Sequence, residues 1–147
     1  MRPAVHSMLG WCLGLGLISV ASAGERVSIG AILEHPADYQ AKVVTVEGRA
    51  RAVSNLPVHR GTPRCGGSAV YDGQMFTLQD ESGSIGIGSA GTCRPGATKL
   101  VVENERLRIR GVVVADEKDP QGIPVIYADA IDHLTRKRSF TNSGAGA

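Results

Sequence analysis

The sequence has few aromatic side chains and little net charge. Only 4% of its 147 residues are aromatic, whereas 19 are glycine. This balance favours a small, tightly turning β domain over a helical bundle. The formal net charge of +2 gives no global electrostatic basis for binding nucleic acid or a membrane surface.

The sequence also has no nucleophile motif, no phosphate-binding glycine loop and no metal-ligand spacing. Asp80 and Glu81 are adjacent carboxylates in a tight-turn sequence, and we interpret them, like Glu105, as turn residues and not as an acid/base pair. His35 precedes a proline and His133 ends the last expected strand, neither with a partner at catalytic or metal spacing. We therefore expect no catalytic residue, no metal and no cofactor; a hydrolase or metal enzyme is the least supported hypothesis.

The first 23 residues have the order of a cleavable signal peptide. Arg2 precedes an uncharged, mostly apolar run from Met8 to Val20, and the small residues Ala21-Ser22-Ala23 follow. The run of about 13 residues is too short to span a bilayer as a helix. We predict cleavage after Ala23 and export to the periplasm or the medium, with no transmembrane segment in the mature chain. A buried core helix is the alternative, and Cys12 lies too early for a lipoprotein.

Cys65 and Cys93 remain after the predicted cleavage. An oxidising compartment favours one disulfide between them. The expected hairpin supports the pairing, because Cys65 precedes the start of one strand and Cys93 follows the end of its neighbour. Unpaired thiols and a metal site are the alternatives, and the sequence contains no CxxC motif.

One short helix and five strands are expected. Ser28 is the expected N-cap of a helix over 28–34, which Pro36 ends. Period-two apolar patterning predicts strands over 43–53, 69–80, 84–89, 106–115 and 124–131. Gly48 marks a bulge or bend in the first strand. Residues 80–83 form a hairpin turn, 55–68 and 91–98 are loops, and the state of 100–102 is undecided.

Apolar side chains alternate along three of these strands. The inward positions are Phe76 and Leu78 in the second, Ile85 and Ile87 in the third, and Leu107 and Ile109 in the fourth. The outward positions of the second strand include Tyr71, Met75, Thr77 and Gln79.

Five strands in this order, with a long bent first strand and a tight hairpin, make a Greek-key barrel. Residues 76–85, FTLQDESGSI, resemble the strand–turn–strand core of OB-fold domains of the tRNA-anticodon-binding and single-stranded-DNA-binding type. Residues 43–48, 107–113 and the lead-in 29–42 match the same pattern. The resemblance covers roughly residues 28–134. It implies an all-β, five-stranded OB-fold barrel over 24–134, followed by a disordered tail over 135–147.

The resemblance also implies a ligand face on the second and third strands, flanked by the loops after the first and fourth. Nucleic-acid binders of this type stack bases on aromatic rings there. Tyr71 is the one ring at the outward positions that we assign to this face, and each base stack contributes ~1–3 kcal/mol. A nucleic-acid ligand is therefore possible but not favoured.

Basic side chains form three groups, each with two interpretations. Arg106, Arg108 and Arg110 share one strand face with Arg49 and Arg51, either as an anion-binding stripe or as a solvated outer face. His59, Arg60 and Arg64 form a basic loop that either holds a phosphate or carboxylate or is a polar loop held by the disulfide. Residues 136–138 (RKR) contact lipid or nucleic acid or belong to a soluble tail.

The sequence thus predicts an exported, non-catalytic OB-fold binding module, whose partner is an unidentified envelope protein or oligomeric ligand. The alternative is a single-stranded oligonucleotide-binding protein. The candidate ligand-binding residues are Tyr71, Met75, Thr77, Gln79, Arg49, Arg51, His59, Arg60, Arg64, Arg108 and Arg110.

The predicted disulfide can be tested by intact-mass analysis. Alkylation of the exported protein should add mass only after reduction, because both thiols of Cys65 and Cys93 are held in the bridge. Two thiols that alkylate without reductant would contradict the pairing.

Overall fold

A computed structural model describes residues 24–60, 63–115 and 122–134. The predicted signal peptide, the basic cluster 136–138, the tail 135–147 and most of the turn at 116–122 lie outside these residues. Within the described ranges, no helix is both long and apolar enough to cross a membrane.

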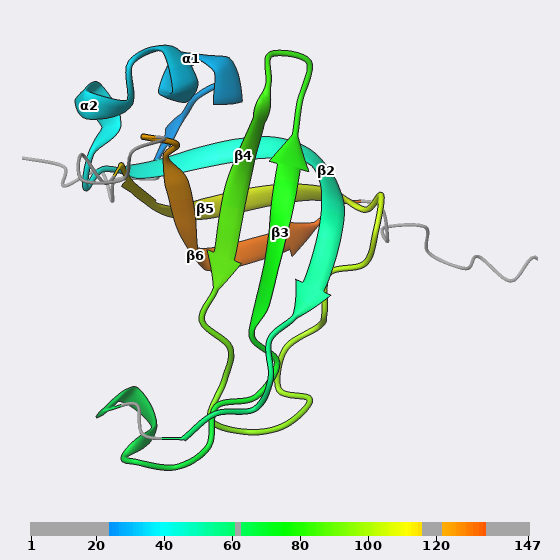
Figure 1. The fold of residues 1–147 in the computed structure, drawn as a ribbon. Coiled ribbons are helices and arrows are strands. Elements are labelled where there is room, and N and C mark those ends of the chain that lie inside the picture. Colours follow the sequence, from blue (N-terminus) through cyan, green and yellow to red (C-terminus); the bar gives the residue numbers. More distant parts are fainter. Residues whose placement is uncertain (1–23, 61–62, 116–121, 135–147) are drawn as a thin grey trace, which may run out of the picture.

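The strands close into a barrel. They are β1 (Glu25–Arg26), β2 (Val43–Asn55), β3 (Gln74–Gln79), β4 (Ser84–Ser89), β5 (Arg106–Val114) and β6 (Val125–His133). Their order in the sheet is β1-β2-β3-β4-β6-β5, and β5 also pairs with β2 (Figure 1). Strands β2 to β6 therefore form a closed five-stranded barrel, which confirms the predicted fold class.

Strand β2 is long enough to serve two neighbours. It pairs with β5 over residues 43–49 and with β3 over residues 49–55. A Cβ at Gly48 would lie 2.5 Å from the carbonyl oxygen of Gln79, so glycine permits the close approach of β3. The bulge lies elsewhere, between Arg51 and Ser54. Ala52 has a φ of 51° there, and the Glu103 carboxylate accepts the N–H groups of Ala52 and Val53 at 3.3 and 3.2 Å.

The core contains the predicted inward side chains. Phe76, Leu78, Ile85, Ile87, Leu107 and Ile109 are all buried, together with Val44, Val46 and Ile126. Helix α1 (Ile29–Glu34) covers one end of the barrel with the buried side chains of Ile29 and Ile32 (Figure 1). Ser28 caps it as predicted, accepting the N–H of Ala31 at 3.3 Å.

Three short elements were not predicted. Helix α2 (Pro36–Tyr39) occupies the expected lead-in to the first strand. Proline is tolerated at the first helical position, because the N–H that it lacks would have no partner within the helix. The single turn η1 (Pro63–Cys65) lies in the long loop. Strand β1 pairs parallel to β2 through two residues, which is too short for a periodic pattern.

Strand β3 begins five residues later than expected. Val70 and Tyr71 form only isolated bridges, with His59 and Thr92. Asp72 then takes a φ of 60° and interrupts the extended chain before Gln74. Residues 100–102, whose state was undecided, belong to no helix or strand, although Val101 is buried.

Strand β6 has two different neighbours. Residues 125–128 pair parallel to β4, and a register shift against β5 follows between Ala128 and Ala130. The strand then bends and continues beside β5 (Figure 1). A Cβ at Gly111 would overlap the carbonyl oxygen of Tyr127, so this bend requires glycine in β5.

Two glycine substitutions test this packing. Gly111→Ala should lower the free energy of unfolding by about 1–3 kcal/mol, because the new methyl group meets backbone that has little room to move. Gly86→Ala is the matched control, since its Cβ would lie 3.6 Å from Val125. This variant should change the free energy of unfolding by less than about 1 kcal/mol. Urea unfolding measures both; equal effects would contradict the close approach.

Candidate functional site

An uncharged surface covers the outer side of three strands. Its outward residues are Met75 and Thr77 of β3, Gly86 and Gly88 of β4, and Val125 and Tyr127 of β6, and we name it the β3–β4–β6 face. Met75 and Tyr127 are 52% and 57% exposed. Both are paired in register with Gly88, which lies between them.

No side chain projects from β4 on this face, because Gly86 and Gly88 are its outward residues, so Met75 and Tyr127 are the two large side chains that project from it. A Cβ at Gly88 would lie 3.2 Å from both Cδ1 and Cε1 of Tyr127, so one edge of the ring occupies the space above the glycine. Tyr127 is in turn opposite Val112, and Val112 is opposite Val43. A transverse row of uncharged residues therefore crosses five strands of the barrel.

Two predicted arginines border the face. Arg51 pairs in register with Thr77, and Arg49 pairs with Gln79. The Arg51 Nε donates to Gln79 Oε1 at 3.4 Å, and Arg49 donates to the carbonyl oxygen of Asn104 at 3.3 Å. Met75, Thr77, Gln79, Arg49 and Arg51 thus lie together, although the sequence grouped the two arginines with those of the fourth strand. Arg49 also pairs in register with Arg106. The role of these residues in binding stays a prediction.

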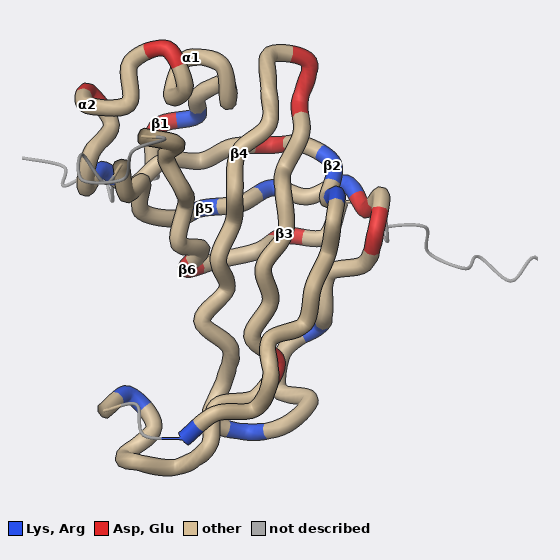
Figure 2. The backbone as a smooth tube through the Cα atoms, viewed as in Figure 1, with Lys and Arg blue, Asp and Glu red and all other residues tan. Residues whose placement is uncertain are grey.

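The arginines of β5 have carboxylate partners. Arg108 and Arg26 approach Glu47 Oε1 at 2.8 and 3.1 Å, and Arg106 approaches Oε2 at 3.8 Å. The hydrogen bond from Arg108 lowers the pKa of the Glu47 carboxyl. Burial partly offsets this effect on the pKa, and the charges of the three arginines reinforce it. Figure 2 shows the arginines of β2 and β5 interleaved with acidic residues.

Arg110 forms its own pair with Asp129, at 3.2 Å. Arg108 and Arg110 therefore take part in ion pairs within the protein, as expected of a solvated outer face. An anion bound there would compete with Glu47 and Asp129 for the arginines. Anion binding by these arginines stays a prediction.

The predicted disulfide joins Cys65 and Cys93. It links the long loop to the segment after β4, at the end of the barrel opposite α1. His59 and Arg64 lie in this region together with Arg60, and all three are exposed. Tyr71 is half-buried, and its backbone exchanges hydrogen bonds of 2.8 and 2.7 Å with Thr92. It therefore lies outside the β3–β4–β6 face, contrary to its predicted place on the second strand.

Asp80 is a turn residue, as predicted, and it also holds α1. Its Oδ1 accepts from the N–H groups of Ser82 and Gly83, at 2.7 and 3.0 Å, and from the Ser82 hydroxyl at 2.6 Å. Its Oδ2 accepts the N–H of Ile29 at 3.0 Å. A polar hollow of about 680 Å³ lies beside this turn, lined also by Arg49 and Arg106. The Asp80 oxygens are thus already used within the fold.

No cluster of three or more metal-ligating side chains occurs among the residues described. Tyr127 is the exposed ring that the sequence analysis missed. The signal was available: Ile126 is apolar and inward in the fifth strand, so alternation directs Tyr127 outward. Its position beside Gly88 depends on the parallel β4–β6 pairing, which the sequence pattern does not give.

No protein-family model and no curated protein sequence matches the chain. Among solved structures, asparaginyl-tRNA synthetase from Pyrococcus horikoshii is similar over 75% of this chain and 23% of the synthetase, with 15% identity and a TM-score of 0.52. The OB domain of Ta0387 from Thermoplasma acidophilum is similar over 74% of this chain and 84% of that domain, with 17% identity and a TM-score of 0.49. The chain spans less than a quarter of the synthetase, and at this identity the likeness concerns the fold alone.

The role of Asp80 can be tested by its pH dependence. Partial burial raises the pKa of the Asp80 carboxyl, but the hydrogen bonds from Ser82, Ile29 and Gly83 outweigh this and the net pKa is lowered. The ionised group therefore stabilises the fold above the ordinary carboxyl pKa of about 3.9, and this contribution is lost as the pH falls through the lowered value.

Asp80→Asn should lower the free energy of unfolding by about 1–3 kcal/mol at neutral pH. The difference from wild type should narrow at a pH below about 3.9. Glu81→Gln, at an exposed neighbouring position, is the control and should have little effect. Urea unfolding at both pH values is the measurement; a difference for Asp80→Asn that does not change with pH would contradict the assignment.

Proposed function

We propose that this protein is an exported, non-catalytic binding module that holds its ligand on the β3–β4–β6 face and the adjoining loops. The observation that carries the proposal is the pair of half-exposed side chains, Met75 and Tyr127, on either side of Gly88. Large apolar side chains gathered on one face mark interaction sites more often than scattered ones do.

The backbone supports a binding role. Both side chains project from paired strands of the closed barrel, and positions on rigid strands hold a recognition surface more accurately than loops do. Gly88 has no side chain, so the edge of the Tyr127 ring lies against the sheet there. The ring and Met75 are the groups that a ligand would contact. Arg51 and Gln79 add polar groups beside Thr77.

The chemistry of the face favours binding over catalysis. Its six residues offer only the hydroxyls of Thr77 and Tyr127 as polar side-chain groups. The Asp129 carboxylate, two residues from Tyr127 in β6, is paired with Arg110, and those of Glu47 and Asp80 accept hydrogen bonds within the fold. Acid/base and nucleophilic mechanisms need a base within hydrogen-bond reach of the reacting group.

The disulfide supports export. Bridges such as Cys65–Cys93 persist in oxidising compartments and are rare where thiols are kept reduced. Together with the signal-peptide pattern of residues 1–23, this favours an envelope or extracellular partner, either another protein or an oligomeric ligand.

A single-stranded oligonucleotide is the second candidate ligand. Tyr127 provides the stacking ring that the outward positions of β3 lack, and Arg49 and Arg51 lie along the same side of the barrel. A ring with neighbouring arginines is the combination that single-stranded nucleic-acid binders use.

Capture from the protein's own envelope fraction tests the primary proposal. Wild type should retain a component of this fraction, and the Met75→Ala/Tyr127→Ala double variant should bind it at least about tenfold more weakly. A tenfold weaker affinity is a loss of ~1.4 kcal/mol of binding free energy. Val102→Ala, another half-exposed apolar position outside the face, should retain it normally. Equal retention by the double variant, or no retained component, would count against the face.

A salt titration with a short oligodeoxythymidine separates the two ligand classes. Affinity that falls steeply with salt, and that Tyr127→Ala weakens, would favour the oligonucleotide, because phosphate contacts release counterions. Absence of binding at low salt would eliminate it and leave the envelope partner.

A further inference from the structure

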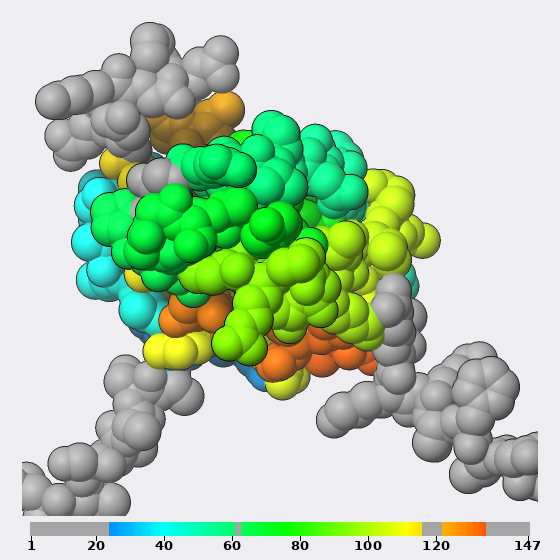
Figure 3. Space-filling view, turned by 90° about the horizontal axis from the view of Figure 1, so that it is seen from below, coloured from blue at the N-terminus to red at the C-terminus, as the bar shows by residue number. Residues whose placement is uncertain are grey.

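A second cleft, of about 390 Å³, lies near the end of the barrel opposite α1. One wall is formed by residues 89–92, where the chain leaves β4, and the other by 128–131 and His133 of β6. Figure 3 views this end of the molecule, with the segment after β4 in yellow-green beside β6 in orange. The volume is within the range of about 300–1,000 Å³ that is usual for ligand pockets.

The lining pattern shows which part of β6 faces the cleft. Side chains of a strand alternate between two faces, so a cavity over one face is lined by every second residue. Here four consecutive residues, 128–131, line the cleft, and so do 89–92 opposite them. The cleft therefore runs along the backbone edge of β6.

Among the residues that the structure describes, no strand lies beside this edge. Pairing between β4 and β6 ends at Ala128, and residues 130–133 pair with β5 alone. The N–H of Leu134 donates to the carbonyl oxygen of Arg106 at 2.9 Å, toward β5. Because backbone groups alternate along a strand, the N–H and C=O groups of His133 and Ile131 face the cleft. Within the described chain, the segment 89–99 forms no backbone hydrogen bond with them.

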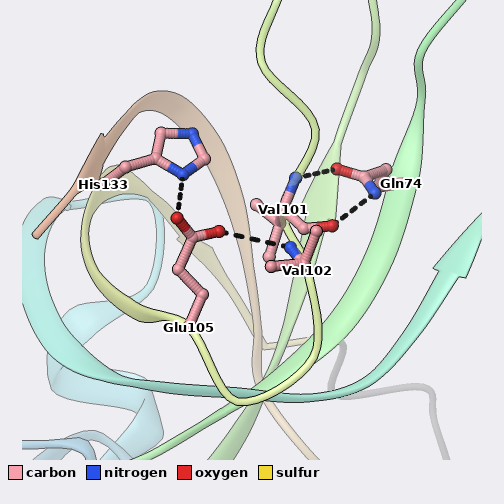
Figure 4. Close-up of polar contacts among 5 residues, drawn as sticks. All are labelled: Gln74, Val101, Val102, Glu105 and His133. Atoms are coloured by element: carbon pink, nitrogen blue, oxygen red, sulfur yellow. Dashed lines mark hydrogen bonds and ion pairs between the residues drawn. The ribbon is translucent and has the colours of Figure 1, made fainter. Parts of the chain in front are cut away.

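Buried polar contacts hold this edge in place. The Glu105 carboxylate lies 2.9 Å from Nδ1 of His133 and accepts the N–H of Val102 at 3.2 Å. Gln74 exchanges bonds of 2.8 and 3.1 Å with the backbone of Val101 (Figure 4). His133 and Gln74 both line the cleft, so its walls are formed before any ligand arrives.

The charges at the cleft favour an acidic occupant. Asp129 is paired with Arg110. Asp72 accepts the N–H of Gly96 at 2.7 Å but keeps its negative charge, so the two remaining cations of the lining exceed it by one charge. Arg64 and Lys99 also line the cleft, are exposed, and form no ion pair with a described carboxylate. The basic residues 136–138 of this chain have the same sign as these two cations, so the tail is a poor occupant.

We propose that the cleft binds an extended acidic segment of a partner protein, which adds a strand to the free edge of β6 at residues 131–133. Main-chain hydrogen bonds to Ile131 and His133 supply affinity in this mode of recognition, and side-chain contacts supply specificity. Arg64 and Lys99 contact the carboxylates of the segment. The site is separate from the β3–β4–β6 face.

Two capped nonapeptides with the same alternating valine and threonine pattern provide the test, one with three aspartates and the other with three lysines. NMR should show slower hydrogen exchange at the Ile131 and His133 amides with the aspartate peptide only. Arg64→Glu/Lys99→Glu should weaken its binding by at least about tenfold. Arg94→Glu, an exposed arginine in the same segment that does not line the cleft, should change it by less than about twofold.

Three outcomes would overturn the proposal. The first is no binding of the aspartate peptide at about 1 mM; a Kd of that size corresponds to only ~4 kcal/mol. The second is equal binding of the lysine peptide. The third is binding that leaves the Ile131 and His133 amides unprotected from exchange. Tyr127→Ala should leave peptide binding unchanged, so failure here and failure of the β3–β4–β6 face are distinguishable.

Discussion

The barrel depends on β6 having two neighbours in turn. Its first four residues pair with β4 and close the sheet, and the rest of the strand continues along β5. The change of neighbour requires the bend near Asp129, and the bend requires the absence of a side chain at Gly111. Closure removes most of the open sheet edges that would otherwise pair with other chains. Residues 130–133 of β6 keep an open edge, because they pair with β5 alone.

Both surfaces to which we assign a role follow from this one constraint. The β4–β6 pairing directs Tyr127 outward beside Gly88 and opposite Met75, and so creates the β3–β4–β6 face. The end of the same pairing leaves the backbone edge that lines the second cleft. The carboxylates Glu47, Asp80, Glu103 and Glu105 mostly hold elements together: they pair with arginines or His133, or accept backbone N–H groups. This use of acidic groups fits a scaffold for binding.

Much of the fold could be predicted from local patterns. Alternation fixed the inward residues of β3, β4 and β5, Ser28 identified the start of α1, and the hairpin placed Cys65 near Cys93. The errors arose where a long-range contact decides the structure. The bulge lies at Ala52 because Glu103, about fifty residues away, accepts its N–H. The position of Tyr127 beside Gly88 and the Glu105–His133 pair were missed because both depend on the order of the strands, which periodicity does not give.

The most direct test of the account is an NMR measurement at the β4–β6 pairing. We predict nuclear Overhauser contacts between the Tyr127 ring protons and the Hα of Gly88, with amides of residues 86–89 and 125–128 protected from exchange. Absence of these contacts, with the same amides exchanging at solvent rates, would mean that the barrel is open and that neither proposed surface exists.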